Sequence, residues 1–179
     1  MGLTLEPLAD NNDPWVIALE RLEAKILNPD LSFHKFCMSA WGVAPRVFSL
    51  ASENTGDNMV YDPPLDKCPA VVLEVSNPGV TEDRGAGAEL WPFTIGVYYK
   101  AWARDGRKVP LLRGFKELIR TVFCGWRTGT MDPLSNIGTG GYSLLPTDLT
   151  PEISRPSGGM LVGKGAFALR FIFSESILG

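Results

Sequence analysis

The sequence has little of what metal and nucleophile chemistry requires, since its 179 residues include one histidine and three cysteines. The single histidine, His34, excludes a metal site built from several histidines. Cys37, Cys68 and Cys124 are odd in number and widely spaced, which fits neither a disulfide framework nor a zinc knuckle. We therefore expect reduced, partly buried thiols in a cytosolic compartment.

Long apolar runs and positive charge are also scarce. The longest apolar runs, such as residues 15–19, reach about five residues, whereas a membrane span needs roughly twenty. The 17 basic and 20 acidic residues give a net charge of −3, and a protein whose whole surface coats nucleic acid would be basic. Residues 1–8 lack the basic start of an export signal. The sequence thus predicts no membrane span, no export and no sequence-specific binding of nucleic acid, although a local basic patch stays open.

The composition is that of a folded protein rich in turns. Hydrophobic residues make up 45% of the chain and charged residues 21%, which excludes wholesale disorder. The 19 glycines and 14 prolines exceed the average share of these residues, which favours a β-rich fold with substantial loops. The length suits one domain, so we predict a single domain over residues 1–179.

Helical periodicity appears at two places in the chain. Residues 14–27 follow Asp13, which can cap the first amides of a helix, and they end before Pro29. Their apolar residues recur at steps of three and four, at Trp15, Leu19, Leu22 and Ile26. Residues 109–124 place seven apolar residues within one arc of about 140°, namely Leu111, Leu112, Phe115, Leu118, Ile119, Val122 and Phe123. We predict a helix over each range.

Strand periodicity marks four further segments. The clearest is 89–104, where apolar residues on odd positions define a side that faces a core, namely Trp91, Phe93, Ile95, Val97, Tyr99 and Ala101. Residues 69–76 and 160–174 are predicted strands, and so are residues 142–153, interrupted or bent at Pro146. Apolar residues between 31 and 50 fit neither period. Short strands or a strand-like arm stay open there, within a long irregular segment at 28–68.

These elements follow one another as helix, strand, strand, helix, strand, strand. Consecutive strands without a crossover helix pair antiparallel, and an amphipathic helix covers part of a sheet face. We therefore predict an α+β domain with an antiparallel sheet of four or more strands, flanked by two helices.

The sequence offers no recognisable catalytic machinery. The only histidine, His34, is flanked by phenylalanines, and no nucleophile-elbow motif occurs. Residues 85–87 lack the third glycine of a dinucleotide-binding fingerprint and precede a strand rather than a helix. Glu82, Asp83 and Glu89 match no calcium-loop spacing, so a solvated charged loop is favoured over an ion site. We predict no catalytic, cofactor-binding or metal-binding residue and no enzymatic activity.

Charged residues gather at two places. Arg113, Lys116 and Arg120 are spaced by three and four residues, which puts them on one helical face. That face is either the solvated back of an amphipathic helix or a contact surface for an acidic protein or a phosphate. Residues 80–88 form a charged, glycine-rich connection that is too long for a tight hairpin turn.

The order and size of these elements resemble the tail terminator and tail-completion proteins of long-tailed bacteriophages. The likeness is carried by the helix at 14–27, the strands at 69–76 and 89–104, and the helix at 109–124 with its final hairpin. It lies in the arrangement and in no signature motif. Proteins of that family are small α+β proteins that form hexameric rings at the head-proximal end of the tail tube, stop its growth and dock the head.

The resemblance implies a non-enzymatic virion protein without a cofactor, made in the host cytoplasm and located in the tail or neck. Its expected partners are further copies of itself in a ring, expected to be a hexamer, the tail tube and the head–neck proteins. The predicted assembly contacts are Glu82, Asp83, Arg84, Arg113, Lys116 and Arg120. The alternatives are another neck, connector or tail-tube-related protein, a small cytosolic enzyme, or a binding module of cellular origin.

Overall fold

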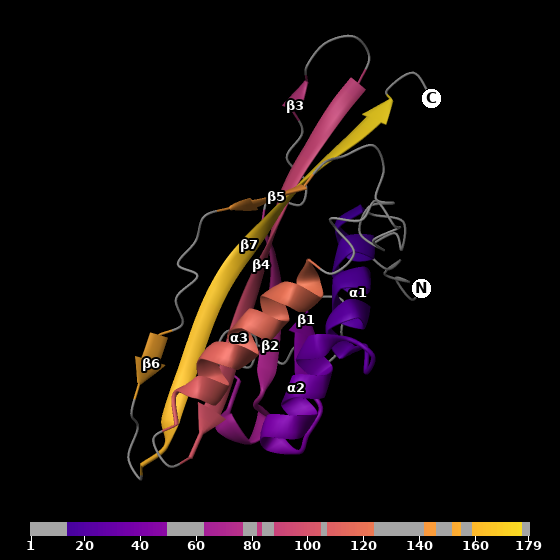
Figure 1. Cartoon of the computed structure of the whole chain (residues 1–179). Helices are drawn as coiled ribbons and strands as arrows, with labels where there is room; N and C mark the ends of the chain where they lie inside the picture. The colour runs from indigo at the N-terminus through magenta and orange to yellow at the C-terminus, as the bar shows by residue number, and fades with distance from the viewer. Residues whose placement is uncertain are drawn as a thin grey trace, which may run out of the picture.

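Within the residues that the structure describes, three α-helices pack against a mixed seven-stranded sheet (Figure 1). The computed structural model describes residues 14–49, 63–76, 82–83, 88–104, 107–123, 142–145, 152–154 and 159–176. The helices are α1 (Pro14–Leu27), α2 (Ser32–Trp41) and α3 (Val109–Val122), with a short 3-10 helix at Leu65–Lys67. The strands are β1 (Arg46–Ser49), β2 (Ala70–Ser76), β3 (Glu82–Asp83), β4 (Ala88–Ala103), β5 (Tyr142–Leu145), β6 (Glu152–Ser154) and β7 (Leu161–Ser176).

The α+β class is confirmed, but the prediction of an antiparallel sheet is wrong at one edge. The strands run in the order β1-β2-β4-β7-β5, with β3 beside β4 and β6 beside β7. All pairs are antiparallel except β1 with β2, which run parallel from Arg46↔Ala70 to Ser49↔Leu73. A hairpin can join only antiparallel strands. Two parallel strands need a longer connection, because the chain must come back to the end of the sheet at which the first strand began.

The predicted irregular segment at 28–68 instead contains α2, β1 and the 3-10 helix. The prediction of two helices and of the order of elements is therefore wrong. Phe33 and Cys37, four residues apart, are both fully buried on α2. Gly42 ends the helix in the left-handed conformation at φ 70°, which glycine adopts without a steric cost.

The other predicted elements agree with the structure, and the segment at 142–153 is interrupted as predicted. The helices at 14–27 and 109–124 match α1 and α3, and the strands at 69–76, 89–104 and 160–174 match β2, β4 and β7 to within two residues at each end. The predicted strand at 142–153 is two short strands, β5 and β6. They pair with different stretches of β7, around Phe171–Ala168 and Lys164–Val162.

One hydrophobic core lies between the helices and the inner face of the sheet. The odd positions of β4 from Ile95 to Ala103 are at most 5% exposed, whereas Tyr98 between them is 40% exposed. The predicted parity of this strand is confirmed there, and the side chains of Trp91 and Phe93 lie outside the described residues. Gly165 of β7 lacks a Cβ that would stand 2.7 Å from the ring of Phe115, so α3 packs closely on the sheet.

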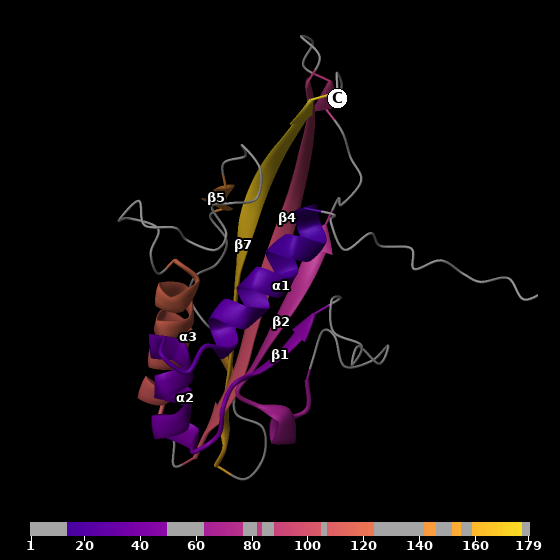
Figure 2. The ribbon, with the colours of Figure 1, turned by 90° about the vertical axis from the view of Figure 1, so that its right-hand side faces the viewer.

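The long strands β4 and β7 extend past the helices. They pair over their whole length, from Ala103↔Leu161 to Ala88↔Ser176, whereas β2 covers only Thr94–Lys100 of β4. Figures 1 and 2 show the far end of this pair projecting beyond α1 and α3. We call this end, made of β3 with residues 88–90 and 174–176, the ribbon tip.

Candidate assembly interface

The outer side of α3 forms a shallow groove of about 430 Å³ that combines cations with exposed apolar side chains. Val109 is 69% exposed and Leu112 is 43% exposed. Leu112 was predicted to share the buried arc of this helix, and the structure turns it outward. We call this surface the α3 groove, and it is lined by Val109, Leu112, Arg113, Lys116, Glu117 and Arg120.

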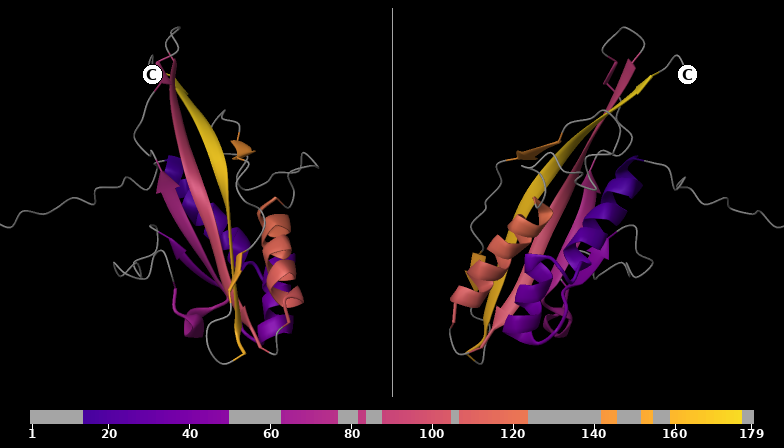
Figure 3. Two further views of the ribbon diagram at one scale, coloured as in Figure 1. Left: turned by 90° about the vertical axis from the view of Figure 1, so that its left-hand side faces the viewer. Right: turned by 45° about the vertical axis from the view of Figure 1, so that its right-hand side comes forward.

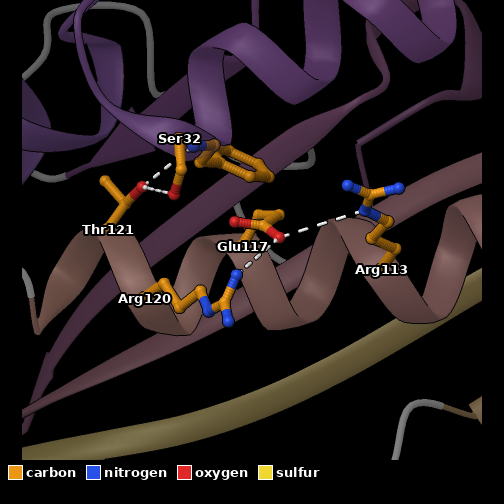
Figure 4. Close-up of polar contacts among 6 residues, drawn as sticks. Ser32, Arg113, Glu117, Arg120 and Thr121 are labelled. Carbon is orange, nitrogen blue, oxygen red and sulfur yellow. Dashed lines mark hydrogen bonds and ion pairs between the residues drawn. The ribbon is translucent and has the colours of Figure 1, made fainter.

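Glu117 pairs with two of the three cations of the α3 groove, Arg113 and Arg120 (Figure 4). Its carboxylate oxygen Oε1 lies 3.2 Å from Nη1 of Arg120 and 4.0 Å from Nε of Arg113. Glu117 is only 7% exposed, whereas both arginines are exposed at the surface. Three positive side chains and one negative one leave the groove with a surplus of two positive charges. Glu117 therefore orients the guanidinium groups without neutralising the surface.

Helix α2 holds one side of this surface in place. The guanidinium carbon of Arg113 lies 5.6 Å from the centre of the Phe36 ring, in the range of a cation–π contact. Thr121 Oγ1 accepts a hydrogen bond from the backbone N–H of Phe33 at 2.9 Å and lies 3.3 Å from Ser32 Oγ (Figure 4). Thr121 thus caps the start of α2 from another helix, a role that Leu31 at the cap position cannot perform.

Helix α1 fixes the C-terminal end of α3. The ammonium group of Lys25, which is 6% exposed, donates a hydrogen bond to the carbonyl oxygen of Val122 at 2.9 Å. A cation at the last carbonyls of a helix satisfies an orphan acceptor and complements the helix dipole. The α3 groove therefore sits on a helix that is tied to both of its neighbours.

The ribbon tip carries the opposite charge. Asp83 of β3 pairs in register with Glu89 of β4, and Glu89 pairs with Glu175 of β7. We call these three residues the acidic row. Glu82 and Asp83 were predicted in a loop and instead form β3, while Arg84 lies outside the described residues. The acidic row could not be predicted from the sequence, because residues far apart in the chain become neighbours only through the register of the strands.

The structure does not bring the two sets of predicted contact residues together. Leu111 and Phe115 place α3 over Gly163 and Gly165 of β7. Glu175 lies ten residues beyond Gly165, which is roughly 33 Å along a strand. Within one molecule the α3 groove and the acidic row are therefore out of reach of each other, and Figure 3 shows α3 well away from the far ends of β4 and β7.

A second recess, of about 400 Å³, lies at the opposite end of β4 from the ribbon tip. Trp41 Nε1 donates a hydrogen bond to the carbonyl oxygen of Trp102 at 2.6 Å, and the Arg104 guanidinium carbon lies 5.4 Å from the Trp102 ring centre. We call this the arginine recess, and its lining is Ala40, Trp41, Trp102, Ala103, Arg104, Arg107 and Pro110.

Other groups that the sequence put forward for chemistry lie elsewhere. His34 is half-buried on α2. Burial raises the pKa of the Cys37 thiol to about 12, so this thiol stays protonated and is a poor nucleophile. Burial, followed by the charges of Cys37 and Cys68, also raises the pKa of Tyr99. In the part of the chain that the structure describes, no three His, Cys, Asp or Glu residues gather as metal ligands.

No protein-family model matches the chain, and no curated protein matches it. Among the described residues, no helix is both long enough and apolar enough to cross a membrane.

Proposed function

We propose that the protein is a non-enzymatic structural subunit of a tailed bacteriophage. Its copies form a ring, expected to be a hexamer, at the head-proximal end of the tail, where the ring ends growth of the tail tube and joins the head to the tail. The protein is then made in the host cytoplasm and carried in the virion.

The observation that carries this proposal is the placement of two surfaces of opposite charge on one chain. The α3 groove is positive and the acidic row is negative, and Glu175 of that row lies roughly 33 Å along β7 from Gly165, on which Phe115 of α3 packs. Surfaces that complement each other but lie on different parts of a subunit produce head-to-tail contacts, which close into a ring when the rotation allows. The phage tail as the setting comes from the resemblance to tail terminator proteins, whose likeness rests on the elements at 14–27, 69–76, 89–104 and 109–124, present here as α1, β2, β4 and α3.

Native mass spectrometry of the purified chain, alone and mixed with tail-tube subunits, tests the proposal. We expect a mass several times the 19.5 kDa of one chain, either alone or once tube subunits are present, and we expect tubes to stop lengthening when the protein is added. A protein that stays at 19.5 kDa and leaves tube length unchanged contradicts the proposal. Assembly without an effect on tube length favours another neck or connector role instead.

The arginine recess favours a second candidate function, a module that binds an anion. The Arg104 guanidinium lies over the Trp102 ring and Arg107 also lines this recess, and guanidinium groups near an aromatic ring suit a phosphate attached to a planar group. Titration with a nucleoside diphosphate, followed by isothermal calorimetry of the original chain and of Arg107→Ala, tests it. Equal heats for both proteins exclude this role.

A further inference from the structure

The α3 groove divides into an apolar half and a cationic half. Val109 and Leu112 expose apolar side chains near the start of the helix, and Lys116 and Arg120 follow them toward its C-terminal end. A surface that fits this helix therefore carries an apolar side chain at one end and a carboxylate at the other.

The exposed side of α1 is such a surface. Glu20, Ala24 and Leu27 are all exposed, and steps of four and three residues put them within about 60° of one another around the helix. We call these three residues the α1 stripe. It carries a carboxylate toward its N-terminal end and an apolar side chain at its C-terminal end, and the small Ala24 between them leaves room for a second helix.

The α1 stripe cannot fill the α3 groove of its own chain. Lys25 bonds the Val122 carbonyl, so its side of α1 is the one that faces α3. The stripe lies roughly 130° around the helix from Lys25 and therefore points away from α3. Helix α1 packs beside β1, whereas α3 packs on β4 and β7, so the two helices lie toward opposite edges of the sheet (Figure 1).

The directions of the two helices suit a side-by-side contact between copies. Figure 1 shows α1 running downward and α3 running upward. A ring whose axis lies along the strands keeps both directions from copy to copy. We propose that α3 of one copy packs antiparallel against the α1 stripe of the next copy. This inference rests on the proposed function, because it names the contact that joins neighbouring subunits.

The spacing of the residues agrees with this packing. Leu27 lies seven residues from Glu20 on α1, which is roughly 10 Å along the helix. Leu112 lies eight residues from Arg120 on α3, which is roughly 12 Å. With Leu27 against Leu112, Glu20 therefore comes beside the cations of the other helix, Lys116 and Arg120.

A second carboxylate extends the match past the end of α1. Asp30 is exposed in the turn that follows Leu27, so the antiparallel arrangement places it beside the start of α3. Arg107 and Lys108 are exposed there, and the first turn of α3, which the structure describes in full, has no acidic residue. Negative charge is favoured at this end of a helix.

Charge reversal on each helix tests this contact. Glu20→Lys and Lys116→Glu are the single variants, and the protein with both changes restores an opposite pair in swapped order. Asp66→Lys is the matched control, because it makes the same change of charge at an exposed position of the short 3-10 helix, outside both helices of the contact. Circular dichroism first establishes that every variant is folded, and native mass spectrometry then measures assembly.

We expect each single variant to assemble at least about tenfold more weakly than the original chain at ~0.1 M salt, where surface charges still interact. The double variant should recover to within about threefold, and Asp66→Lys should match the original. If the original chain assembles and both single variants assemble equally well, the contact is wrong while the ring proposal stands. Weaker assembly of Glu89→Lys with unchanged assembly of Glu20→Lys assigns the α3 groove to the acidic row and also overturns the contact.

The length of tail tubes separates this contact from the proposed function. If the variants assemble as expected but the original chain leaves tube length unchanged, the contact stands and the proposed function fails. If the original chain stays monomeric even with tail-tube subunits, both fail.

Cross-linking gives a direct readout of the same contact. Leu27→Cys and Leu112→Cys are prepared as separate proteins, each with Cys124→Ser, and are then mixed and oxidised. Cys37 and Cys68 are buried, so they compete little for the reaction. We expect a covalent pair with one chain of each kind, and none when Leu112→Cys is mixed with Asp66→Cys in the same background. Equal cross-linking in both mixtures overturns the proposal.

Discussion

The two halves of the β4–β7 pair share one antiparallel ladder but differ in what lies against them. We call the half beneath the helices the covered half. Near Ala103↔Leu161 the strands lie beneath α3, and their inward side chains, from Ile95 to Ala103 and at Leu161, Phe167 and Leu169, are almost fully buried. Near Ala88↔Ser176 the same strands run past the helices and carry the acidic row. One continuous ladder therefore passes beneath the helices at one end and pairs acidic residues in register at the other. Changes in the first half should alter folding, and changes in the second half should alter assembly.

The largest expected effect is on folding, in the covered half. Ile95 is fully buried, and removal of a large aliphatic side chain from a core costs about 2–5 kcal/mol. Ile95→Ala should lower the free energy of unfolding, measured by urea denaturation, by that amount. Thr94→Ala on the opposite face of the strand is the control and should cost clearly less. Equal losses for the two variants would contradict the assignment of the inner face.

A smaller effect on folding is expected where α2 begins. Thr121→Val keeps the shape of the side chain but removes the oxygen that accepts the Phe33 N–H. An unpaired buried amide costs about 1–3 kcal/mol. Thermal and urea unfolding should both report this loss. Ser32→Ala removes the hydroxyl that is 3.3 Å from Thr121 but leaves the amide capped, so a loss as large as that of Thr121→Val would argue against the cap.

The core above the covered half should also make stability depend on pH in the alkaline range, because it contains Cys37 of α2. The buried Cys37 thiol has a pKa raised from 9.0 to about 12, so it stays protonated in the folded chain while the unfolded chain loses the proton above pH 9. Its contribution is fully present below pH 9 and is lost as the pH rises toward 12, by about 1.4 kcal/mol at pH 10. Urea midpoints at pH 8 and pH 10 measure this loss. Cys37→Ala should show a shallower decline, and an unchanged decline would assign the effect to other groups.

The covered half and the helices packed on it are also the part of the fold that the sequence predicts best. Burial on one side leaves a period of two in β4 and a helical period in α1 and α3, so these elements follow from residue spacing alone. Helix α2 has the same kind of spacing at Phe33 and Cys37, but the atom that caps it belongs to Thr121 of α3. A cap supplied by a distant part of the chain leaves no local signal.

The charged surfaces follow from the sequence only in part. Arg113, Lys116 and Arg120 share a face because helical spacing is local, and the place of Glu117 between the arginines follows the same rule. The acidic row needed the register of three strands, and Glu175 lies far along the chain from Asp83 and Glu89. The parallel pairing of β1 with β2 could not be predicted from the sequence either, because it depends on the path of the chain between the two strands.

The smallest effect on folding is expected at the ribbon tip. Replacing residues 80–87 with a Gly-Ser turn removes β3, which pairs with β4 at only two positions, Glu82↔Leu90 and Asp83↔Glu89. Because the core lies beneath the helices, and because loop length changes folding free energy slowly, we expect a change in the free energy of unfolding of less than about 1 kcal/mol. Assembly should nevertheless weaken, since Asp83 of the acidic row is lost. Urea denaturation and native mass spectrometry of the same shortened chain separate the two quantities. A loss of stability comparable to that of Ile95→Ala would mean that the tip belongs to the folding core, and unchanged assembly would remove β3 from the contact between subunits.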